Sequence, residues 1–119
     1  MSDKYNIRSI SRSELNEKID RDDDFELIEV LPSEDFEEYH IPGAINIPGD
    51  ELRDAVPDRI SHKEREIVVY CSDSSCEASP RAARLLLDMG YTNVRDYEGG
   101  KEDWRDGGLP VESGPVQHA

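Results

Sequence analysis

A short apolar run, followed by a polar loop and then a helix start, constrains the fold of this chain more than any other feature. Residues 67–71 read IVVYC, and these largely β-branched, apolar side chains predict a strand that is buried on both faces. After the loop, Ser79 and Pro80 form an N-cap and a first helical residue, and a helix pattern continues as far as Gly90. A buried strand, a loop and a helix in this order predict a parallel sheet that is covered by helices.

The other segments also alternate between strand and helix patterns. Strands are predicted at 5–10, 25–30, within 40–48 and at 93–97, and helices at 11–19, 33–39, 51–55 and around Trp104. Ser11 is the expected N-cap of the first helix, with Glu14 as its capping-box partner. Ser33 is the expected cap of the second helix, and Pro57 is expected to follow the third.

This order of elements predicts one three-layer α/β domain. The 119 residues are enough for a single hydrophobic core and too few for two. We expect the domain to span residues 6–113, with flexible ends at 1–5 and 114–119.

Charge and composition exclude several classes of protein. Acidic residues outnumber basic ones by 28 to 14, and the formal net charge of -14 argues against a nucleic-acid partner. No apolar run approaches the ~20 residues that cross a bilayer, and the N-terminus lacks the apolar core of a signal peptide. We therefore expect a cytoplasmic protein with no membrane contact. The excess of carboxylates fits either a salt-rich cytoplasm, in which ions screen their repulsion, or an ordinary small acidic protein.

Cys71 is the first candidate for chemistry, because it directly follows the apolar strand. In open parallel sheets, ligands bind beyond the carboxyl ends of the strands. The loop after Cys71 leads into a helix N-terminus, whose N–H groups and partial positive charge favour a thiolate, a persulfide or an oxyanion. A cysteine at this place is alternatively a small apolar core residue, but the capped helix behind it favours chemistry.

A metal site is not expected. The chain has two cysteines, Cys71 and Cys76, without the second pair of ligands that zinc usually requires. Both are interpreted as cytosolic thiols, and no cofactor is expected.

Several segments resemble, in order, the single-domain rhodaneses. They are HIPGAINIP at 40–48, VVYC at 68–71, GYTNV at 90–94, YEGG at 97–100, Trp104, and GLPV at 108–111. The resemblance implies a central, mostly parallel five-stranded sheet flanked by helices. It also implies that a cysteine, matching Cys71, accepts a sulfane sulfur as a persulfide and passes it to a nucleophile.

The loop after Cys71 departs from the family's usual pattern. Seven residues separate Cys71 from Ser79 and none of them is basic, whereas the usual loop is shorter and includes an arginine. A loop of this length is similar to those of rhodanese-fold phosphatases and arsenate reductases. Those enzymes carry an arginine near the end of the loop, where this chain has Glu77 and Ala78, so phosphatase or oxyanion reductase activity is disfavoured.

Two further departures lie outside the loop. Residues 29–31 read EVL where the family commonly shows Asp-Val-Arg, so one expected cation near the site is missing. Tyr39 replaces the glycine that usually precedes the histidine matching His40.

Cys76 leaves three interpretations open. It is a partner thiol that attacks a persulfide on Cys71 or closes a reversible disulfide with it, it is itself the reactive thiol, or it is an incidental loop cysteine. The CxxxxC loop resembles that of a rhodanese-like subgroup, which favours a role for Cys76. We rank Cys71 first as the nucleophile, and Cys76 as a partner ahead of sole nucleophile.

The expected substrate-binding residues line this loop and the helix after it. They are Ser72, Asp73, Ser74, Ser75, Glu77, Ala78, Ser79 and Arg81. Backbone N–H groups of the segment are expected to stabilise a terminal sulfur anion. Arg81 and Arg84 either offer charge to an anionic donor or are solvated surface residues. His40 and Trp104 are expected to be structural.

These observations predict a small sulfurtransferase of the rhodanese type. Its donor would be a small anion such as thiosulfate, or a persulfide-carrying protein, and its acceptor a nucleophile. The alternative is a non-catalytic rhodanese-like binding or thiol redox-sensing module, which the missing loop arginines and the two thiols of one loop suggest.

Overall fold

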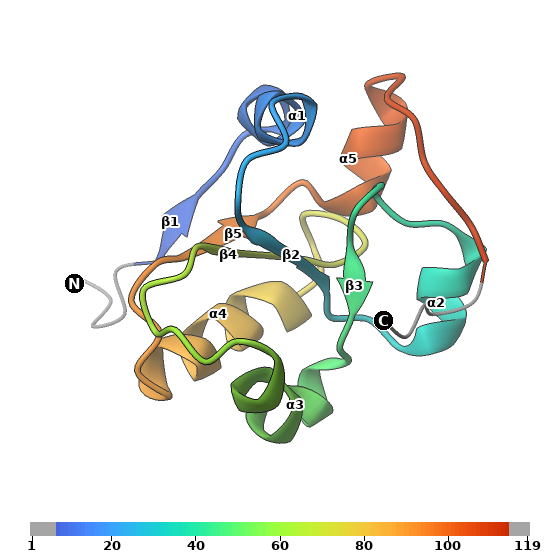
Figure 1. The fold of residues 1–119 in the computed structure, drawn as a ribbon. Coiled ribbons are helices and arrows are strands. Elements are labelled where there is room, and N and C mark those ends of the chain that lie inside the picture. The colour runs from blue at the N-terminus through green and yellow to red at the C-terminus, as the bar shows by residue number, and fades with distance from the viewer. Residues whose placement is uncertain (1–6, 115–119) are drawn as a thin grey trace.

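Strands and helices alternate along residues 7–114, the part of the chain that the computed structural model describes (Figure 1). The strands are β1 (Arg8–Ser9), β2 (Glu26–Glu29), β3 (Ile45–Asn46), β4 (Ile67–Tyr70) and β5 (Val94–Tyr97). The helices are α1 (Arg12–Asp20), α2 (Ser33–Glu38), α3 (Leu52–Arg59), α4 (Ala78–Asp88) and α5 (Gly100–Asp106), with a 3-10 turn η1 (Gly49–Glu51) before α3. Of the ends expected to be flexible, all but Gly114 lie outside the described residues, and the N–H of Gly114 donates to the Glu37 carbonyl at 2.9 Å.

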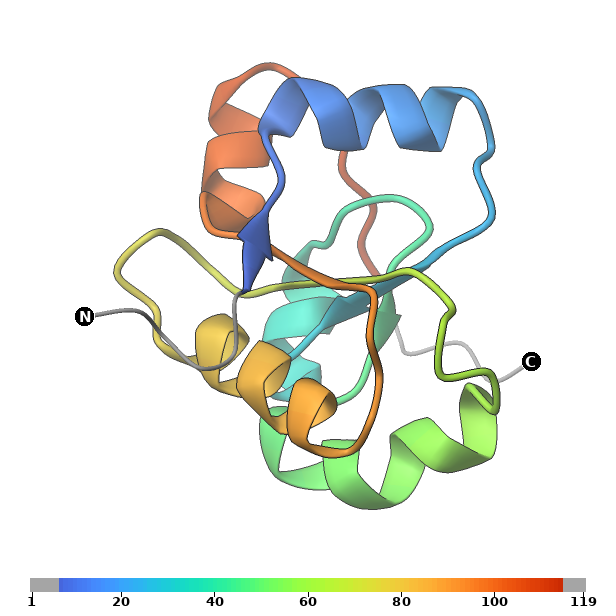
Figure 2. The same ribbon diagram turned by 90° about the vertical axis from the view of Figure 1, so that its left-hand side faces the viewer.

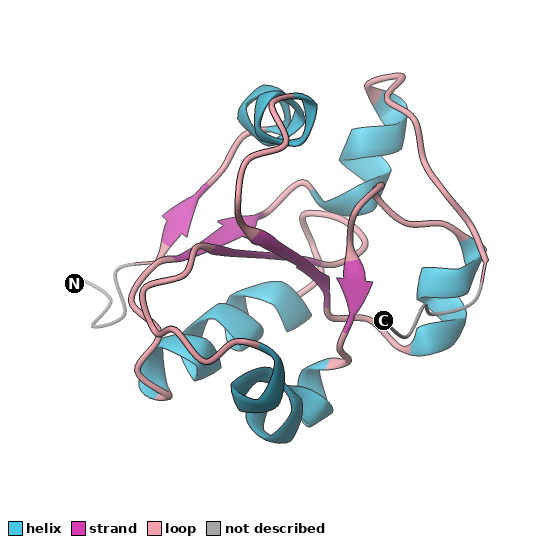
Figure 3. Ribbon diagram, viewed as in Figure 1, coloured by secondary structure: helices cyan, strands magenta, loops and turns pink. Residues whose placement is uncertain are grey.

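The described strands form one five-stranded sheet in which every pair is parallel. Their order is β1-β5-β4-β2-β3, so β4 is the central strand (Figure 3). Tyr70 at the end of β4 lies level with Glu29 of β2 and with Tyr97 of β5. The predicted α/β class and five-stranded sheet are confirmed, and the sheet is parallel throughout.

Helices cover both faces of the sheet, and each face has its own hydrophobic core (Figures 1 and 2). Successive side chains of β4 point to opposite faces. Ile67, Val69 and Cys71 pack with residues of α3 and α4, whereas Val68 and Tyr70 pack with residues of α1 and α5. The continuous apolar run at 67–71 is therefore explained, because both faces of the central strand are buried.

Ser11 caps α1 as predicted, but the capping box is incomplete. The Ser11 hydroxyl accepts from the Glu14 N–H at 3.1 Å. The Glu14 carboxylate does not turn back to the cap, and instead accepts from the Arg95 guanidinium of β5 at 2.7 and 3.0 Å. A charged partner on the sheet thus outcompetes a neutral backbone donor.

Three other expected helix boundaries are shifted. α2 begins at Ser33 itself, and α4 begins at Ala78, with Glu77 at the cap position. Ser79 and Pro80 lie inside the first turn of α4, where N–H groups lack intrahelical partners and proline is tolerated. α3 runs through Pro57, because Leu52 and Val56 anchor one face in the core while the proline lies exposed on the other.

Candidate active site

Cys71 lies where the sequence places it, directly after the central strand. Its side chain is 1% exposed and faces the α3 and α4 side of the sheet. The N-terminus of α5 anchors the chain at this point, because the N–H of Lys101 donates to the Cys71 carbonyl at 3.0 Å and that of Glu102 to the Ser72 carbonyl at 2.9 Å. First-turn donors of one helix thereby hold the start of the loop.

Gly100 makes this anchoring possible. Its φ is +72°, and a Cβ atom there would lie 2.6 Å from the Ser72 carbonyl carbon and 2.7 Å from both the Asp73 nitrogen and the Cys71 oxygen. Backbone atoms of the loop therefore leave no room for a side chain at position 100, and the positive φ of this residue also disfavours one.

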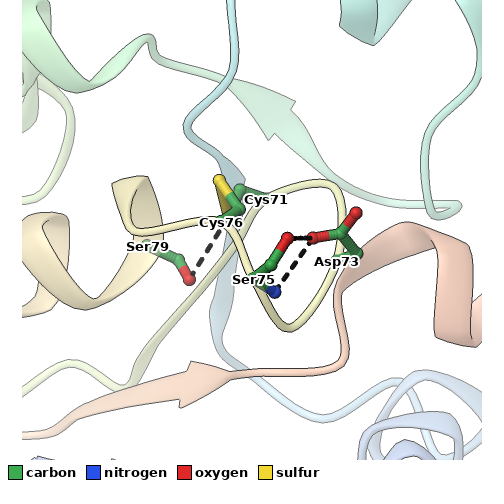
Figure 4. Close-up of a disulfide and its surroundings, with 5 residues drawn as sticks. All are labelled: Cys71, Asp73, Ser75, Cys76 and Ser79. Atoms are coloured by element: carbon green, nitrogen blue, oxygen red, sulfur yellow. Dashed lines mark hydrogen bonds between the residues drawn. A yellow bond between two sulfur atoms is a disulfide. The ribbon is translucent and has the colours of Figure 1, made fainter.

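The loop folds back on itself at Asp73 (Figure 4). The Asp73 carboxylate accepts from the Ser75 N–H at 2.9 Å and from the Ser75 hydroxyl at 2.6 Å, and the Asp73 carbonyl accepts from the Cys76 N–H at 3.1 Å. These hydrogen bonds, those from Ser75 foremost, lower the pKa of the Asp73 carboxyl. The turn brings Cys76 back to Cys71.

Cys71 and Cys76 form a disulfide in this structure, with their Cα atoms 6.4 Å apart (Figure 4). This separation is within the usual range for a disulfide. The structure thus differs from the interpretation of both residues as free thiols, because the turn at Asp73 shortens the distance that five residues of chain would otherwise allow. A disulfide with Cys71 was one of the interpretations of Cys76 that the sequence left open, and the structure contains this disulfide.

Ser79, one of the expected binding residues, lies beside the sulfur of Cys71. It is 2% exposed, and its Oγ lies 3.6 Å from Cys71 Sγ (Figure 4). Asp96 of β5, a residue that the sequence analysis did not single out, lies level with Val69 of β4. Asp96 is 2% exposed, and burial, the main cause, raises its pKa to about 6.

The other expected binding residues differ in their exposure to solvent and in their contacts. Ser74 and Glu77 are exposed, Ser72 and Ala78 are partly buried, and Asp73 and Ser75 bind each other. The first-turn donors of α4 are the N–H groups of Ala78 and Ser79, because Pro80 has none.

Arg81 forms an exposed ion pair with Glu77. Its guanidinium lies 3.5 Å from the Glu77 carboxylate, and both side chains are largely exposed. Arg84 is partly buried, and its charge acts to lower the pKa of Asp96. For Arg81, the solvated interpretation therefore fits better than a role in binding the donor.

A buried ion pair lies on the opposite face, beside the carboxyl end of β4. The Lys101 ammonium donates to the Glu29 carboxylate at 3.1 Å, and the Tyr70 hydroxyl donates to the same carboxylate at 2.9 Å. Lys101 also donates to the carbonyls of Asp35 and Tyr39 at 2.7 and 2.8 Å, which ties the end of α2 to the sheet. This lysine of α5 therefore serves the packing of the core rather than the loop after Cys71.

Burial raises the pKa of the Glu29 carboxyl, while the charge of Lys101 and the hydrogen bond from Tyr70 act in the opposite direction. A glutamate in an apolar strand was the sequence signal for such a partner, because a buried carboxylate is rarely left unpaired. The sequence alone did not indicate which lysine or arginine would pair with Glu29.

His40 and Trp104 make packing and hydrogen-bond contacts, which fit the structural roles expected for them. His40 Nδ1 lies 2.7 Å from the Phe36 carbonyl, and its ring stacks on that of Phe36 at 3.7 Å. Trp104 is 1% exposed, and its indole N–H donates to the Pro110 carbonyl at 2.8 Å.

Within residues 7–114 no three or more His, Cys, Asp or Glu side chains are grouped closely enough to hold a metal ion. No helix in the same part of the chain is long and apolar enough to cross a membrane.

Comparison with known proteins places this domain in a family. The model of the rhodanese-like domain matches residues 11–106. The chain belongs to the rhodanese-like family. Its relatives include an HTH-type transcriptional regulator of Mycobacterium tuberculosis, 42% identical over 93 residues, which cover 77% of this chain and 40% of the regulator. They also include the thiosulfate sulfurtransferase PspE of Escherichia coli, 33% identical over 75 residues, which cover 63% of this chain and 70% of PspE.

A solved structure shares this fold. A crystal structure of a Bacillus halodurans protein matches this rhodanese-like domain with a TM-score of 0.83 and 29% identity, over 89% of this chain and 77% of that one. The chain spans less than half of the transcriptional regulator, so similarity to that protein concerns one part of it.

Proposed function

We propose that this rhodanese-like domain is a sulfurtransferase that carries sulfane sulfur as a persulfide on Cys71. The observation that carries the proposal is the position of Cys71, at the carboxyl end of the central strand and before a loop that leads into the N-terminus of α4. A family that includes a thiosulfate sulfurtransferase supports it. The donor class is a small anion such as thiosulfate or a persulfide-carrying protein.

The reaction is two displacements at sulfur. The Cys71 thiolate attacks the outer sulfur of thiosulfate, the S–S bond of the donor breaks, and sulfite leaves with the bonding electron pair. An acceptor thiolate then attacks the terminal sulfur of the persulfide, and the Cys71 thiolate leaves. Neighbouring backbone N–H groups, with Ala78 and Ser79 at the start of α4, would stabilise the anionic terminal sulfur.

Cys76 has the geometry of a partner thiol in this reaction. Its thiolate would attack Sγ of the Cys71 persulfide, forming the Cys71–Cys76 disulfide and releasing hydrosulfide. The two cysteines are oxidised and the sulfane sulfur is reduced, so electrons balance. The disulfide in the structure supports this role, because it shows that the two sulfur atoms can bond without leaving the fold. In the cytoplasm, where we place the protein, cellular thiols would reopen the disulfide.

Intact mass spectrometry after incubation with thiosulfate tests the proposal. The protein is first reduced and freed of reductant, so that Cys71 is a thiol. A gain of one sulfur, about 32 Da, is expected transiently in the wild type, persistently in Cys76→Ala and never in Cys71→Ala. Sulfide release is expected from the wild type alone, because only it holds both thiols. A sulfur adduct on Cys71→Ala but not on Cys76→Ala would overturn the assignment and make Cys76 the carrier.

A thiol redox-sensing module is the second candidate, and the disulfide together with the 1% exposure of Cys71 favours it. A sensor predicts that mild oxidant removes two hydrogens from the reduced wild type, while thiosulfate leaves its mass unchanged. Persistent sulfur on Cys76→Ala would reject this candidate, because a sensor has no need to hold a transferred atom.

A further inference from the structure

Cys76 is the more accessible half of the disulfide. Cys71 is 1% exposed, whereas Cys76 is partly exposed on the loop after β4, which projects beyond the sheet (Figure 2). Cys71 belongs to the hydrophobic core on the α3 and α4 side, and Cys76 packs against that core from the loop. In thiol–disulfide exchange, access helps to decide which of the two sulfur atoms a thiolate attacks. A thiol that arrives from solvent therefore reaches Cys76 first.

The surroundings of Cys71 favour its departure as a thiolate. In the disulfide Cys71 Sγ carries no hydrogen, so the Ser79 hydroxyl, whose Oγ lies 3.6 Å away, is the donor of the contact between them (Figure 4). Ser79 also lies in the first turn of α4, where free N–H groups and the partial positive charge of the helix stabilise an anion. An anion on Cys76 would instead lie next to the exposed Glu77, in a loop that has no basic residue. The sulfur that is better stabilised as an anion leaves faster.

We propose that thiols reduce this disulfide by attack on Cys76 Sγ, so that Cys76 is the site of a mixed disulfide and Cys71 is released as a thiolate. The incoming thiolate forms a bond to Cys76 Sγ, the Cys71–Cys76 bond breaks, and its electron pair leaves with Cys71. A second thiolate then attacks the sulfur of the bound thiol, and Cys76 leaves as a thiolate. Two external thiols are oxidised to one disulfide and the protein disulfide is reduced, so electrons balance.

This inference rests on the proposed function, because it determines when Cys71 is free to take up sulfur. While Cys76 holds the first thiol, it has no thiolate with which to attack a persulfide on Cys71. The mixed disulfide therefore favours transfer of the sulfane sulfur to an external acceptor, whereas the fully reduced protein can also release it as hydrosulfide.

The test maps the first adduct and needs no sulfur donor. The oxidised wild-type protein is mixed with 2-mercaptoethanol and quenched at short intervals with N-ethylmaleimide, which blocks each free thiol and stops further exchange. Tandem mass spectrometry of the tryptic peptide 66–81, which holds both cysteines, shows which one carries the thiol. We expect mercaptoethanol on Cys76 and maleimide on Cys71, in roughly tenfold excess over the opposite arrangement.

Mercaptoethanol on Cys71 with maleimide on Cys76 would overturn the proposal, and so would equal amounts of the two arrangements. The result is independent of sulfur transfer. An adduct on Cys76 without any persulfide after thiosulfate would reject the proposed function alone. A persulfide on Cys71 together with a mercaptoethanol adduct on Cys71 would reject only this inference.

Ser79→Ala tests the leaving group separately. Without the hydroxyl, 2-mercaptoethanol should open the disulfide roughly tenfold more slowly, because the departing Cys71 thiolate loses a hydrogen-bond donor. Ser79→Thr keeps the hydroxyl and should open at close to the wild-type rate. Ser61→Ala is the control and should match the wild type, because this exposed serine precedes β4 and lies at the opposite end of that strand from Cys71. Circular dichroism checks that each variant is folded. An unchanged rate in folded Ser79→Ala would contradict the departure of Cys71 beside Ser79.

Discussion

Asp96 gives the protein a dependence of stability on pH that opposes ordinary acid denaturation. Burial raises its folded-state pKa to about 6, above the roughly 3.9 expected in the unfolded chain. The stabilising effect of the protonated acid is therefore fully present below pH ~3.9 and is lost as pH rises through ~6.

Asp96→Asn should thus gain stability relative to the wild type between pH 4 and pH 7. Its free energy of unfolding should rise relative to wild type by up to about 3 kcal/mol over this interval, which corresponds to a shift of roughly two pKa units. Urea unfolding of both proteins at several pH values measures the difference. A difference that is constant with pH would mean that Asp96 keeps its ordinary pKa in the folded state.

Lys101 stabilises the fold because it pairs with a carboxylate that is buried in the core. It is 3% exposed and neutralises Glu29, which is fully buried. Lys101→Met would leave that carboxylate without its cation, and we expect a loss of about 3–5 kcal/mol in the free energy of unfolding.

Urea unfolding at pH 7 measures this loss. Arg21→Ala, which breaks an exposed ion pair with Asp23, is the matched control and should leave the unfolding midpoint nearly unchanged. Equal effects of the two substitutions would show that the Glu29 pair contributes no more than a surface pair.

The contact between the first turn of α5 and the loop after Cys71 holds the start of that loop in place. Gly100 allows the first turn of α5 to approach the backbone at Cys71 and Ser72. Gly100→Ala should destabilise the protein by more than the ~1–2 kcal/mol of a left-handed alanine, and should also change the reactivity of Cys71.

Gly43→Ala is the control for Gly100→Ala. Gly43 has a similar φ of +88°, but a Cβ atom there meets nothing within 4 Å, so only the backbone strain of about 1–2 kcal/mol remains. Thermal or urea unfolding compares the two variants, and alkylation of the reduced proteins reports on Cys71. Equal losses in the two variants would mean that the loop moves away at no cost.

Helix boundaries show why local patterns were only partly sufficient. Ser11 and Gly90 act at the predicted helix ends, because caps satisfy groups of the adjacent turn. The prediction placed the start of α4 after Ser79, whereas the helix begins at Ala78. It also ended α3 before Pro57, because it did not foresee that burial of Leu52 and Val56 holds the helix together beyond the proline.

The net charge of -14 affects the molecule as a whole. If its carboxylates are adapted to a salt-rich cytoplasm, the free energy of unfolding should increase from roughly 0.05 M to 1 M NaCl, where the Debye length falls to about 3 Å. Urea unfolding at the two salt concentrations measures this. Asp20→Asn/Asp22→Asn, at two exposed positions, should show a smaller increase, because less repulsion remains to be screened. Equal wild-type stability at both concentrations would contradict the adaptation.

The order of strands and helices, the central position of β4 and the place of Cys71 could all be predicted from the chain, because they follow from local hydrophobic patterns and from a family resemblance. The pairing of Cys71 with Cys76, by contrast, depends on the turn at Asp73, and the buried Asp96 lies level with Val69 on a neighbouring strand. Lys101 likewise reaches Glu29 across 72 positions of the sequence. Such contacts follow from parallel pairing, which places residues that are distant in sequence at one edge of the sheet, and no local pattern encodes which of them will meet.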